Sequence, residues 1–200
     1  MVDKNSSLFK EEKKDYSIYC GVDEAGRGPL AGALVMAGVL LLEPIEDLKD
    51  SKKLTAKKRE KLYGIIKQSS KYYIYEANAQ KIDQIGLSRC LKEGLSLIKK
   101  HFKDTPIIFD GNSSFGVDGI ETMIKADDKI DCVKAASILA KVYRDNQMVE
   151  YSKIYPEYKF EKHKGYGTKA HLEAIAKYGY CKIHRVSFKI KLPNSENSLF

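Results

Sequence analysis

The chain has 200 residues, of which 43% are hydrophobic, and its formal net charge is +8. A hydrophobic fraction of this size excludes wholesale disorder and is enough for the core of one domain. The positive charge favours a polyanionic partner, which could be nucleic acid, an acidic membrane face or an acidic protein, although it could also serve solubility alone. Composition therefore predicts one folded domain and leaves its partner open.

Three further features bear on where the protein works. Residues 1–15 are polar and mixed in charge, so they lack the apolar core of a signal peptide. The apolar run 29–42 has 14 residues, too short to span a bilayer, and fits a strand buried on both faces. No C-x-x-C pair occurs among the four cysteines, which we expect to be reduced thiols: Cys20, Cys90, Cys132 and Cys181. These features predict a cytoplasmic protein that makes no membrane contact.

Hydrophobic periodicity and capping residues predict the order of elements along the chain. The predicted elements are a flexible tail (1–15), two strands (16–23 and 33–42), a helix (55–68), a strand (72–77), a helix (87–102), two strands (106–110 and 119–125), two helices (131–151 and 168–178) and a flexible tail (189–200). We expect Thr55 and Asp131 to cap their helices and Gly179 to end the last one. Residues 16–188 would then form one domain, a mixed sheet flanked by helices with a helical carboxy-terminal part.

The segment 21–32 carries the most informative pattern. Asp23 and Glu24 follow an apolar strand and precede a glycine-rich turn with one arginine. Adjacent strand residues point to opposite faces, so both acids can serve one site only if the strand ends or twists there, which Gly26 and Gly28 permit. The spacing is not that of a P-loop, since no Gly-Lys-[Ser/Thr] follows. The pattern favours a functional acid pair over two exposed turn residues.

Two other places along the chain hold acids in comparable positions. Asp110 ends the apolar strand at 106–110, although an acid before a glycine is also a common structural ending. Asp127 and Asp128 precede the helix predicted at 131–151, where they could instead cap the helix or lie in solvent. Carboxylates at strand ends form an all-oxygen site suited to Mg²⁺ or Mn²⁺. In a basic protein such a site indicates a metal nuclease, in which two ions can clamp the displacement at phosphorus.

Six motifs, in order between residues 18 and 188, resemble those of ribonuclease HII. They are Asp-Glu-Ala-Gly-Arg-Gly-Pro (23–29), Asp-Ser-Lys-Lys-Leu (50–54), Asp-Gly-Asn (110–112), Ala-Ala-Ser-Ile-Leu-Ala-Lys-Val (135–142), Lys-Gly-Tyr-Gly-Thr (164–168) and His-Arg-Val-Ser-Phe (184–188). The first and fourth are the most specific. The resemblance implies a ribonuclease H-like fold. It also implies an endonuclease that cuts the RNA strand of RNA–DNA hybrids, and cuts 5′ to a ribonucleotide embedded in duplex DNA, leaving 5′-phosphomonoesters.

The resemblance also implies four catalytic carboxylates that bind the metal ions. Three of them are Asp23, Glu24 and Asp110, and the fourth is the acid of a Lys-Gly-Asp motif. This chain has Lys-Ala-Asp at 125–127, so the glycine is replaced, and a second acid follows. Counting back from the Ala-Ala-Ser-Ile helix assigns the fourth ligand to Asp127.

Substrate recognition follows from the same resemblance. In the family, backbone groups of the Gly-Arg-Gly turn read the 2′-hydroxyl of a ribonucleotide, a role that would fall to Gly26, Arg27 and Gly28. The tyrosine of Lys-Gly-Tyr-Gly stacks on the sugar of the following deoxynucleotide, which assigns that role to Tyr166, a residue otherwise typical of a partly buried core. The remaining substrate-binding residues that the motifs imply are Lys52, Lys53, Ser137, Lys141, His184 and Arg185.

Basic residues gather in the stretches 52–61 and 159–191. Their contacts with phosphate would supply affinity that is independent of sequence and sensitive to salt. For three of them, a solvated helix face is the better interpretation: Lys57, Lys58 and Lys61. In the helix predicted at 131–151 one polar stripe is expected, formed by Lys134, Ser137, Lys141 and Arg144.

Four possible zinc ligands occur near the carboxy-terminal end, but their spacing fits no common zinc pattern. They are His163, His171, Cys181 and His184. We expect the first two histidines to flank the nucleic-acid surface instead.

Two alternatives compete with this interpretation. Ribonuclease HIII lacks the Gly-Arg-Gly turn and has an additional amino-terminal domain, for which the chain before Asp23 leaves no room. A non-catalytic nucleic-acid-binding module would gain nothing from acids beside a phosphate, so the acids at Asp23, Glu24, Asp110 and Asp127 count against it.

The last five residues loosely resemble short peptides that bind the bacterial sliding clamp. A polar segment leads to Leu199 and Phe200, which could enter an apolar pocket of the clamp while the tail tethers the enzyme. The match is partial, and the two residues could instead fold back onto the domain. We expect a monomer whose partners are RNA–DNA hybrids, DNA that contains ribonucleotides and, weakly, the clamp.

Overall fold

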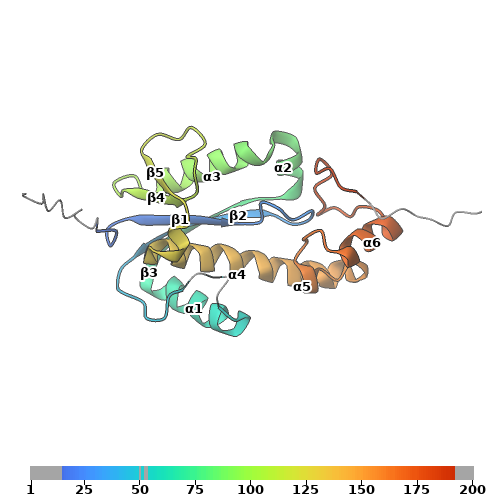
Figure 1. Cartoon of the computed structure of the whole chain (residues 1–200), viewed down its shortest axis with the longest axis horizontal. Coiled ribbons are helices and arrows are strands. Elements are labelled where there is room, and N and C mark those ends of the chain that lie inside the picture. The colour runs from blue at the N-terminus through green and yellow to red at the C-terminus, as the bar shows by residue number, and fades with distance from the viewer. Residues whose placement is uncertain (1–14, 50, 52–53, 192–200) are drawn as a thin grey trace, which may run out of the picture.

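The protein is built on a five-stranded sheet with the order β3-β2-β1-β4-β5 (Figure 1). The computed structural model describes residues 15–49, 51 and 54–191. β2 is antiparallel to β1 and β3, whereas β4 is parallel to β1 and β5, so the predicted mixed sheet is confirmed. The strands are β1 (Cys20–Ala25), β2 (Leu34–Leu41), β3 (Ser70–Ala77), β4 (Ile107–Asp110) and β5 (Ile120–Met123).

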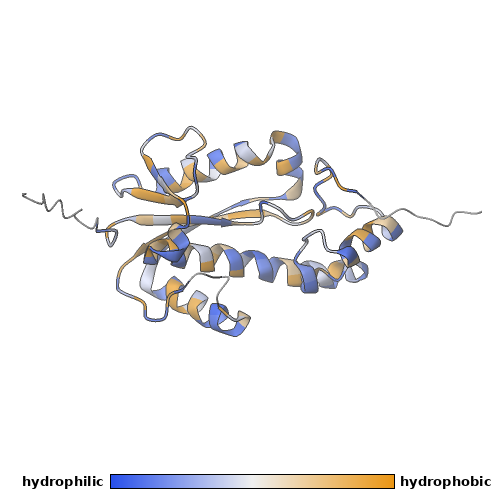
Figure 2. Cartoon of the chain, in the orientation of Figure 1, coloured by the Kyte–Doolittle hydropathy of each residue, from blue (hydrophilic) through white to orange (hydrophobic). Residues whose placement is uncertain are grey.

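Helices cover both faces of this sheet (Figure 1). One face packs against α2 (Ala79–Ile85) and α3 (Leu87–His101), and the other packs against α1 (Ala56–Ser69) and α4 (Asp131–Ile154). The helices alternate between hydrophobic and hydrophilic residues, as helices with one buried face must (Figure 2). Each fully buried aliphatic or aromatic side chain in these two layers contributes about 1.5–3 kcal/mol of transfer free energy.

A further core lies beside the last turns of α4 and forms the predicted helical carboxy-terminal part. Three short helices contribute side chains to this core: η3 (Pro156–Tyr158), α5 (Phe160–His163) and α6 (Lys169–Tyr178). Thr168 caps α6 by accepting a hydrogen bond from the backbone nitrogen of His171 (3.4 Å), and Gly179 ends the helix at φ 77°. The buried residues of this core are Ala31, Met148, Tyr158, Phe160, Ile175 and Ile183.

Two predicted boundaries were wrong for local reasons. The strand predicted from residue 16 begins at Cys20, because a turn precedes it in which the backbone nitrogen of Tyr19 donates to the carbonyl of Tyr16 (3.1 Å). Asp131 does not cap α4. The N-cap residue is Ile130, which makes no side-chain capping bond, and Asp131 is the first helical residue.

One helix of the central layers, α2, was not predicted. Asn78 caps it by accepting a hydrogen bond from the backbone nitrogen of Lys81 (2.9 Å). The helix has seven residues, too few for a hydrophobic period to be recognised. The predicted tails lie almost wholly outside the described residues, and so do Lys52 and Lys53.

Candidate metal centre

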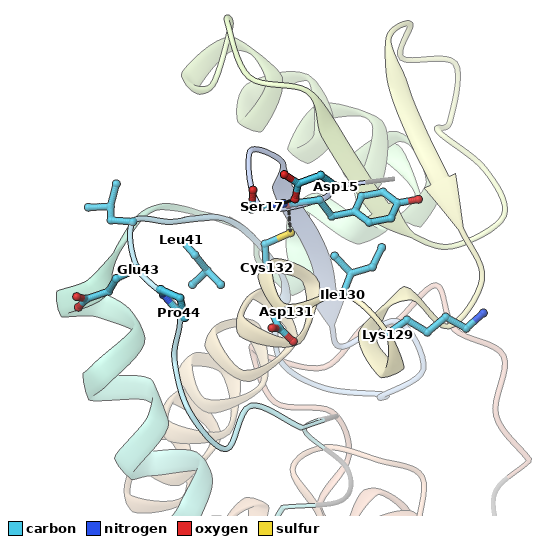
Figure 3. A pocket seen from close by; sticks show the side chains of 11 residues that line it. Asp15, Ser17, Leu41, Glu43, Pro44, Lys129, Ile130, Asp131 and Cys132 are labelled. Atoms are coloured by element: carbon cyan, nitrogen blue, oxygen red, sulfur yellow. Dashed lines mark hydrogen bonds between the residues drawn. The ribbon is translucent and has the colours of Figure 1, made fainter. Parts of the chain in front are cut away.

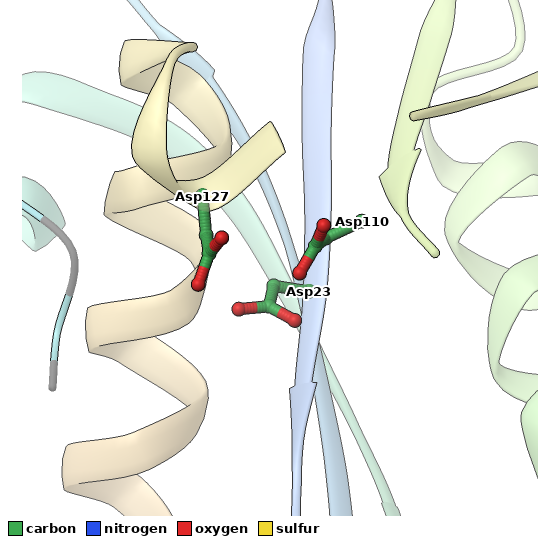
Figure 4. Close-up of side chains that lie close together, drawn as sticks. All are labelled: Asp23, Asp110 and Asp127. Atoms are coloured by element: carbon green, nitrogen blue, oxygen red, sulfur yellow. The ribbon is translucent and has the colours of Figure 1, made fainter. Parts of the chain in front are cut away.

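Three aspartates from different parts of the chain meet at one end of the sheet (Figure 4). Asp23 lies in β1, Asp110 ends β4, and Asp127 lies in the short helix η2 (Ala126–Asp128). One carboxylate oxygen from each lies within 4.8 Å of the others. Among the described residues, these three form the group of acids, histidines or cysteines that could hold a metal ion.

The parallel pairing of β1 with β4 explains why two of these aspartates meet. Val22 pairs with Phe109, so one further step in the same register places Asp23 beside Asp110. Val22 and Phe109 belong to the core on the α3 side. Because strand side chains alternate, the next residue of each strand points to the opposite face, where α4 lies.

Close packing of α4 on β1 completes the pocket for these carboxylates. A Cβ atom on Gly21 would lie 2.3 Å from the carbonyl carbon of Cys132, so only glycine lets the helix approach this closely. The 3₁₀ helix that immediately precedes α4 carries Asp127. Ala126, which replaces the family's glycine, is fully buried in the small core formed with Ile108 and Ile130, and its backbone nitrogen donates to Asp110 Oδ1 (2.9 Å).

Burial makes the negative charge of this centre costly. Asp23 is 6% exposed and Asp127 is 4% exposed. Burial, together with the nearby carboxylates of Glu24 and Asp110, raises the pKa of Asp23 well above its usual value, although a hydrogen bond from the backbone nitrogen of Glu24 (2.7 Å) opposes the shift. Crowded carboxylates of like charge fit a divalent cation, since hard cations prefer oxygen ligands and neutralise the repulsion.

Glu24 is not part of this group of three. β1 continues to Ala25, so the alternation of side chains continues and Glu24 points to the α3 side of the sheet. There its Oε1 lies 2.6 Å from Nε of Arg27, whose guanidinium carbon lies 5.9 Å from the ring centroid of Phe109. A metal-binding role for Glu24 therefore stays a prediction.

Asp127 and Asp128 are separated by the geometry of η2. Asp127 is buried and faces the other two aspartates, whereas Asp128 is exposed. The placement agrees with the choice of Asp127 that was made by counting back from the helix.

Two buried arginines donate hydrogen bonds to the glycine turn after β1 and to the residues that follow it. Arg144 of α4 donates to the carbonyls of Ala31 and Ala33, each at 3.0 Å. Arg185 donates to the carbonyls of Gly32 (3.0 Å) and Arg27 (3.2 Å). Four carbonyls of one segment thus receive charge-assisted hydrogen bonds, which fix its path.

The burial of Arg144 corrects one expectation from the sequence. Arg144 was predicted on one polar stripe with Lys134, Ser137 and Lys141, but it is fully buried and bonds the segment that follows the turn. Ser137 is also buried, and its hydroxyl lies 2.9 Å from that of Ser51, a residue that the sequence did not single out although it lies in the Asp-Ser-Lys-Lys-Leu motif. The periodicity placed these residues on one face of α4 but could not predict that other parts of the chain bury Ser137 and Arg144.

Tyr166 lies at the outer edge of this region and is 44% exposed. Its ring centroid lies 5.9 Å from Nζ of Lys141 and 5.7 Å from the guanidinium carbon of Arg144. Lys141 also pairs with Asp145 at 2.8 Å. An exposed ring beside cations is suited to contact a sugar or base next to a phosphate.

His184 and Arg185 lie beneath the surface, with 2% and 1% of each side chain exposed. Their predicted substrate-binding role stays a prediction. Their hydrogen-bond partners in the structure are backbone groups and, for His184, also the side chains of His171 and Cys181. The expectation that His171 flanks the nucleic-acid surface was wrong, because this ring is fully buried, whereas His163 is partly buried.

A pocket of about 530 Å³ lies beside the start of α4 (Figure 3). Its lining includes Tyr16, Leu41, Pro44 and Cys132, and it contains none of the residues predicted to bind metal or substrate. The aspartate centre is therefore separate from this pocket.

The sequence profile of the Ribonuclease HII family matches residues 20–191. The chain belongs to the ribonuclease HII family. It is therefore an endoribonuclease of the ribonuclease H class, as the six motifs implied, and the non-catalytic and ribonuclease HIII alternatives are set aside.

Curated members of the family resemble the chain over nearly its whole length. Ribonuclease HII of Sulfurovum sp. (strain NBC37-1) is 59% identical over 172 residues, which are 86% of this chain and 92% of that protein. Ribonuclease HII of Campylobacter concisus (strain 13826) is 57% identical over 182 residues, which are 90% of this chain and 98% of that protein.

Solved structures agree with the fold. RNase HII from Archaeoglobus fulgidus, determined in a complex with PCNA, aligns with a TM-score of 0.73 at 25% identity and covers 89% of this chain and 98% of that one. Ribonuclease H2 from Pyrococcus horikoshii OT3 aligns with a TM-score of 0.64 at 30% identity, covering 86% and 93%. The predicted ribonuclease H-like fold is confirmed. Within residues 15–49, 51 and 54–191, no helix is long and apolar enough to cross a membrane.

Proposed function

We propose that this family member hydrolyses the RNA strand of RNA–DNA hybrids and cuts on the 5′ side of a ribonucleotide embedded in duplex DNA. The single observation that carries the proposal is the group of three buried aspartates beside a glycine turn, on a protein of net charge +8. The acids supply ligands for cations, the turn supplies open backbone for a ribose, and the positive charge attracts a polyanion.

Asp23, Asp110 and Asp127 would hold Mg²⁺ or Mn²⁺, with Glu24 as a predicted fourth ligand. When bound, two such ions activate a water molecule and stabilise the leaving oxygen of a phosphodiester. The protein's own contribution is to hold three carboxylates together against their repulsion, through the β1–β4 pairing and the packing of α4.

The Gly26–Gly28 turn would read the 2′-hydroxyl with its backbone. Gly26 has φ 103°, a conformation that a larger residue rarely adopts, and a Cβ atom there would lie 2.5 Å from the carbonyl oxygen of Ala33. Gly28 is exposed, and a Cβ atom there would meet nothing within 4 Å, so its backbone is open to a ligand. Substrate can therefore approach the backbone at Gly28, while Gly26 gives the turn its path.

Tyr166 would stack on the sugar of the following deoxynucleotide, and Lys141 beside it would contact a phosphate. Stacking is insensitive to base identity, so the enzyme would recognise the junction between ribose and deoxyribose and not a sequence. Phosphate contacts from the basic stretches would supply the remaining affinity.

A cleavage assay with four labelled substrates tests this proposal. They are a DNA duplex with one ribonucleotide, a long RNA–DNA hybrid, single-stranded RNA and plain duplex DNA, each incubated with Mg²⁺, with Mn²⁺ or with a chelator. We expect metal-dependent cuts in the first two alone, with the cut in the first on the 5′ side of the ribonucleotide and a 5′-phosphate on the product. Cleavage in chelator, or cuts at another position, would overturn the proposal.

We also propose that the carboxy-terminal tail binds the sliding clamp weakly through Leu199 and Phe200, which lie outside the described residues. The Archaeoglobus fulgidus relative was solved in a complex with PCNA, a precedent for such recruitment. Binding of the full chain and of a chain ending at Ser195 should be compared on immobilised clamp. Stronger binding by the full chain is expected, and equal binding would contradict the idea.

A further inference from the structure

The carboxy-terminal core contains a buried pair of histidines that lies outside the metal centre. His171, in α6, is fully buried, and His184, which follows α6, is 2% exposed. Their Nε2 atoms lie 3.0 Å apart. Buried ring nitrogens are costly unless they are hydrogen-bonded, so the partners of this pair reveal where its protons lie.

The partners determine one protonation state for the pair. His171 Nδ1 lies 2.9 Å from the carbonyl oxygen of Tyr166, which can only accept, so Nδ1 carries the proton and Nε2 accepts. His184 must then donate from Nε2, which leaves its Nδ1 as an acceptor. That atom lies 2.9 Å from the backbone nitrogen of Cys181, which donates. All four ring nitrogens are thus satisfied when both rings are neutral, and no lone pair remains for a zinc ion.

An additional proton breaks this arrangement wherever it binds. On His171 it would set two N–H donors against each other across 3.0 Å. A change of His184 to the other tautomer relieves that contact, but it places an N–H against the donating nitrogen of Cys181 at 2.9 Å and leaves it only the Cys181 sulfur, 3.1 Å away, as a weak acceptor. The contacts of the folded core therefore favour the neutral form of the pair.

The elements packed around the pair do not favour a positive charge either. From α5, the His163 ring stacks on His171 with centroids 4.4 Å apart, and its own partners, the carbonyl of Tyr158 and the backbone nitrogen of Gly165, are satisfied by a neutral ring. Beside His184 lie the rings of Tyr158 and Tyr180 and the Cys181 thiol, whose sulfur is 3.1 Å from His184 Nδ1. Of the charged groups nearby, Glu157 influences the pKa of Cys181, and Glu161 and Lys164 influence that of His163.

The pair connects the two elements to which substrate recognition is assigned. One end bonds the main chain of Tyr166. The other end, His184, forms an isolated β-bridge with Ala31, and its neighbour Arg185 donates to the carbonyls of Gly32 and Arg27. Hydrogen bonds therefore link the tyrosine loop through the two rings to His184, and the next residue, Arg185, bonds the glycine turn.

We propose that His171 and His184 are positioning residues that set the place of Tyr166 relative to the Gly26–Gly28 turn, and that they do so only while both rings are neutral. The inference rests on the proposed function, in which the tyrosine and the turn contact adjacent nucleotides of the junction. Loss of the pair would leave the metal centre intact and would loosen the tyrosine, so the enzyme would lose discrimination more than its capacity for hydrolysis.

The pKa values of the two rings agree with this geometry. Burial, which is the largest cause, and the nearby His163 lower the pKa of both His171 and His184 to about 4. Both rings therefore remain neutral across the pH range in which a histidine in water would become charged.

Nitrogen NMR on the full chain, labelled with ¹⁵N, tests the protonation state directly. We expect His171 as the Nδ1–H tautomer and His184 as the Nε2–H tautomer, with neither ring titrating between about pH 8 and pH 5. Reversed tautomers, or titration of either ring near its ordinary pKa, would overturn the proposal. This measurement needs no substrate, so it is independent of the proposed function.

Variants test the consequence for cleavage. His171→Phe keeps a ring but removes both bonds, His171→Asn keeps a donor close to the Tyr166 carbonyl, and His101→Phe, at an exposed ring on α3, is the matched control. We expect His171→Phe to lower kcat/KM at a single ribonucleotide by about tenfold while changing cleavage of a long hybrid little, with partial rescue in His171→Asn. Equal losses on both substrates, or no rescue, would show a merely structural role.

Tyr166→Ala, assayed beside these variants, separates the two proposals. If Tyr166→Ala cleaves the single ribonucleotide as well as the parent does, the stacking role in the proposed function fails. If Tyr166→Ala is impaired and His171→Phe is not, the function stands and the positioning role fails.

Discussion

The aspartate centre and the histidine pair are both buried clusters of titratable groups, yet the protein treats their charge in opposite ways. At the centre, three carboxylates of like sign lie within 4.8 Å of one another, and burial raises the pKa of Asp23. In the pair, every ring nitrogen meets a complementary partner, and burial lowers the pKa of both rings to about 4. The first cluster needs a cation from outside, whereas the second is complete within the fold.

The difference gives a criterion for interpreting buried titratable groups. A cluster indicates a binding site when the protein leaves its charge uncompensated, and it indicates a support when each polar atom already has a partner. His184 belongs to a motif of the family, but its surroundings place it in the second class. Membership of a motif therefore does not by itself distinguish a residue that contacts substrate from one that holds such a residue in place.

The largest expected effect follows from removing one charge at the centre. Asp110→Asn keeps the shape of the side chain but weakens the ligand set, so cleavage should fall by roughly three orders of magnitude or more. Binding of an RNA–DNA hybrid should survive, because the proposed phosphate contacts come from basic residues outside the aspartate centre. Single-turnover cleavage and a binding titration on the same preparation measure both. Near-normal cleavage in Mg²⁺ would contradict the assignment of Asp110.

A nearly matched pair of variants tests the register across η2. Asp127→Asn should abolish most cleavage, because Asp127 faces the other two aspartates, whereas Asp128→Asn should change it by less than about threefold, because Asp128 is exposed. The two substitutions differ by one position and remove the same charge, so each controls for the other. The reverse order would show that the ligand is Asp128.

A smaller effect is expected at Tyr166, which holds no metal. Tyr166→Ala should reduce kcat/KM for a single ribonucleotide in DNA by about 10- to 100-fold, since stacking on one nucleotide contributes about 1–3 kcal/mol. Tyr166→Phe keeps the ring and should retain most of the activity. Equal activity of parent and Tyr166→Ala on this substrate would remove the tyrosine from recognition.

The smallest effect is on stability, and here the two clusters should respond to acid with opposite signs. The histidines have a folded-state pKa of about 4 against an ordinary 6.5, so the unfolded chain binds more protons between these values and they destabilise the fold as the pH falls from about 6.5 to about 4. Asp23 has a raised folded-state pKa, so its contribution is unfavourable when ionised and is relieved as the pH falls through that value.

Melting temperatures of metal-free protein can separate these contributions. Asp23→Asn should raise the melting temperature by a few degrees at neutral pH and should remove the response to added Mg²⁺. His171→Phe should lower it at neutral pH but reduce its fall between about pH 6.5 and 4.5. A parent protein whose stability does not change over this acidic interval, with an equally flat His171→Phe variant, would contradict the low pKa values.

The sequence predicted the sheet and its main helices, because those depend on local patterns, and it named the three aspartates that the structure brings together. The position of Asp127 could be counted from the following helix, and the place of Asp110 follows from a strand that ends in an acid. Non-local contacts could not be predicted. Nothing in the periodicity of α4 indicates that Arg144 is covered by the carboxy-terminal core and bonds the turn after β1, more than 100 residues earlier in the chain.

The direction of Glu24 also depends on a non-local contact, the pairing of β1 with β2. The sequence predicted that the first strand ends at Asp23, whereas β1 continues to Ala25, and this continuation directs the two acids to opposite faces. The strand continues to Ala25 because its pairing with β2 extends to Val35, and a pairing partner cannot be read from β1 alone. Capping was predictable where the side chain is a good acceptor, as at Thr55, and failed where an apolar residue precedes the helix, as at Ile130.

The four unpaired cysteines are distributed so that they can report how the native protein opens. Cys20 and Cys90 lie in the core on the α3 side, and Cys132 lies in the small core at the start of α4. Burial raises the pKa of all three thiols, that of Cys132 to about 12, so few of them are ionised and reagents cannot reach them in the closed fold. Alkylation therefore requires a local opening of the structure. The rate at which each thiol is modified, followed by mass spectrometry, therefore measures separately how often each face of the sheet loses its helices.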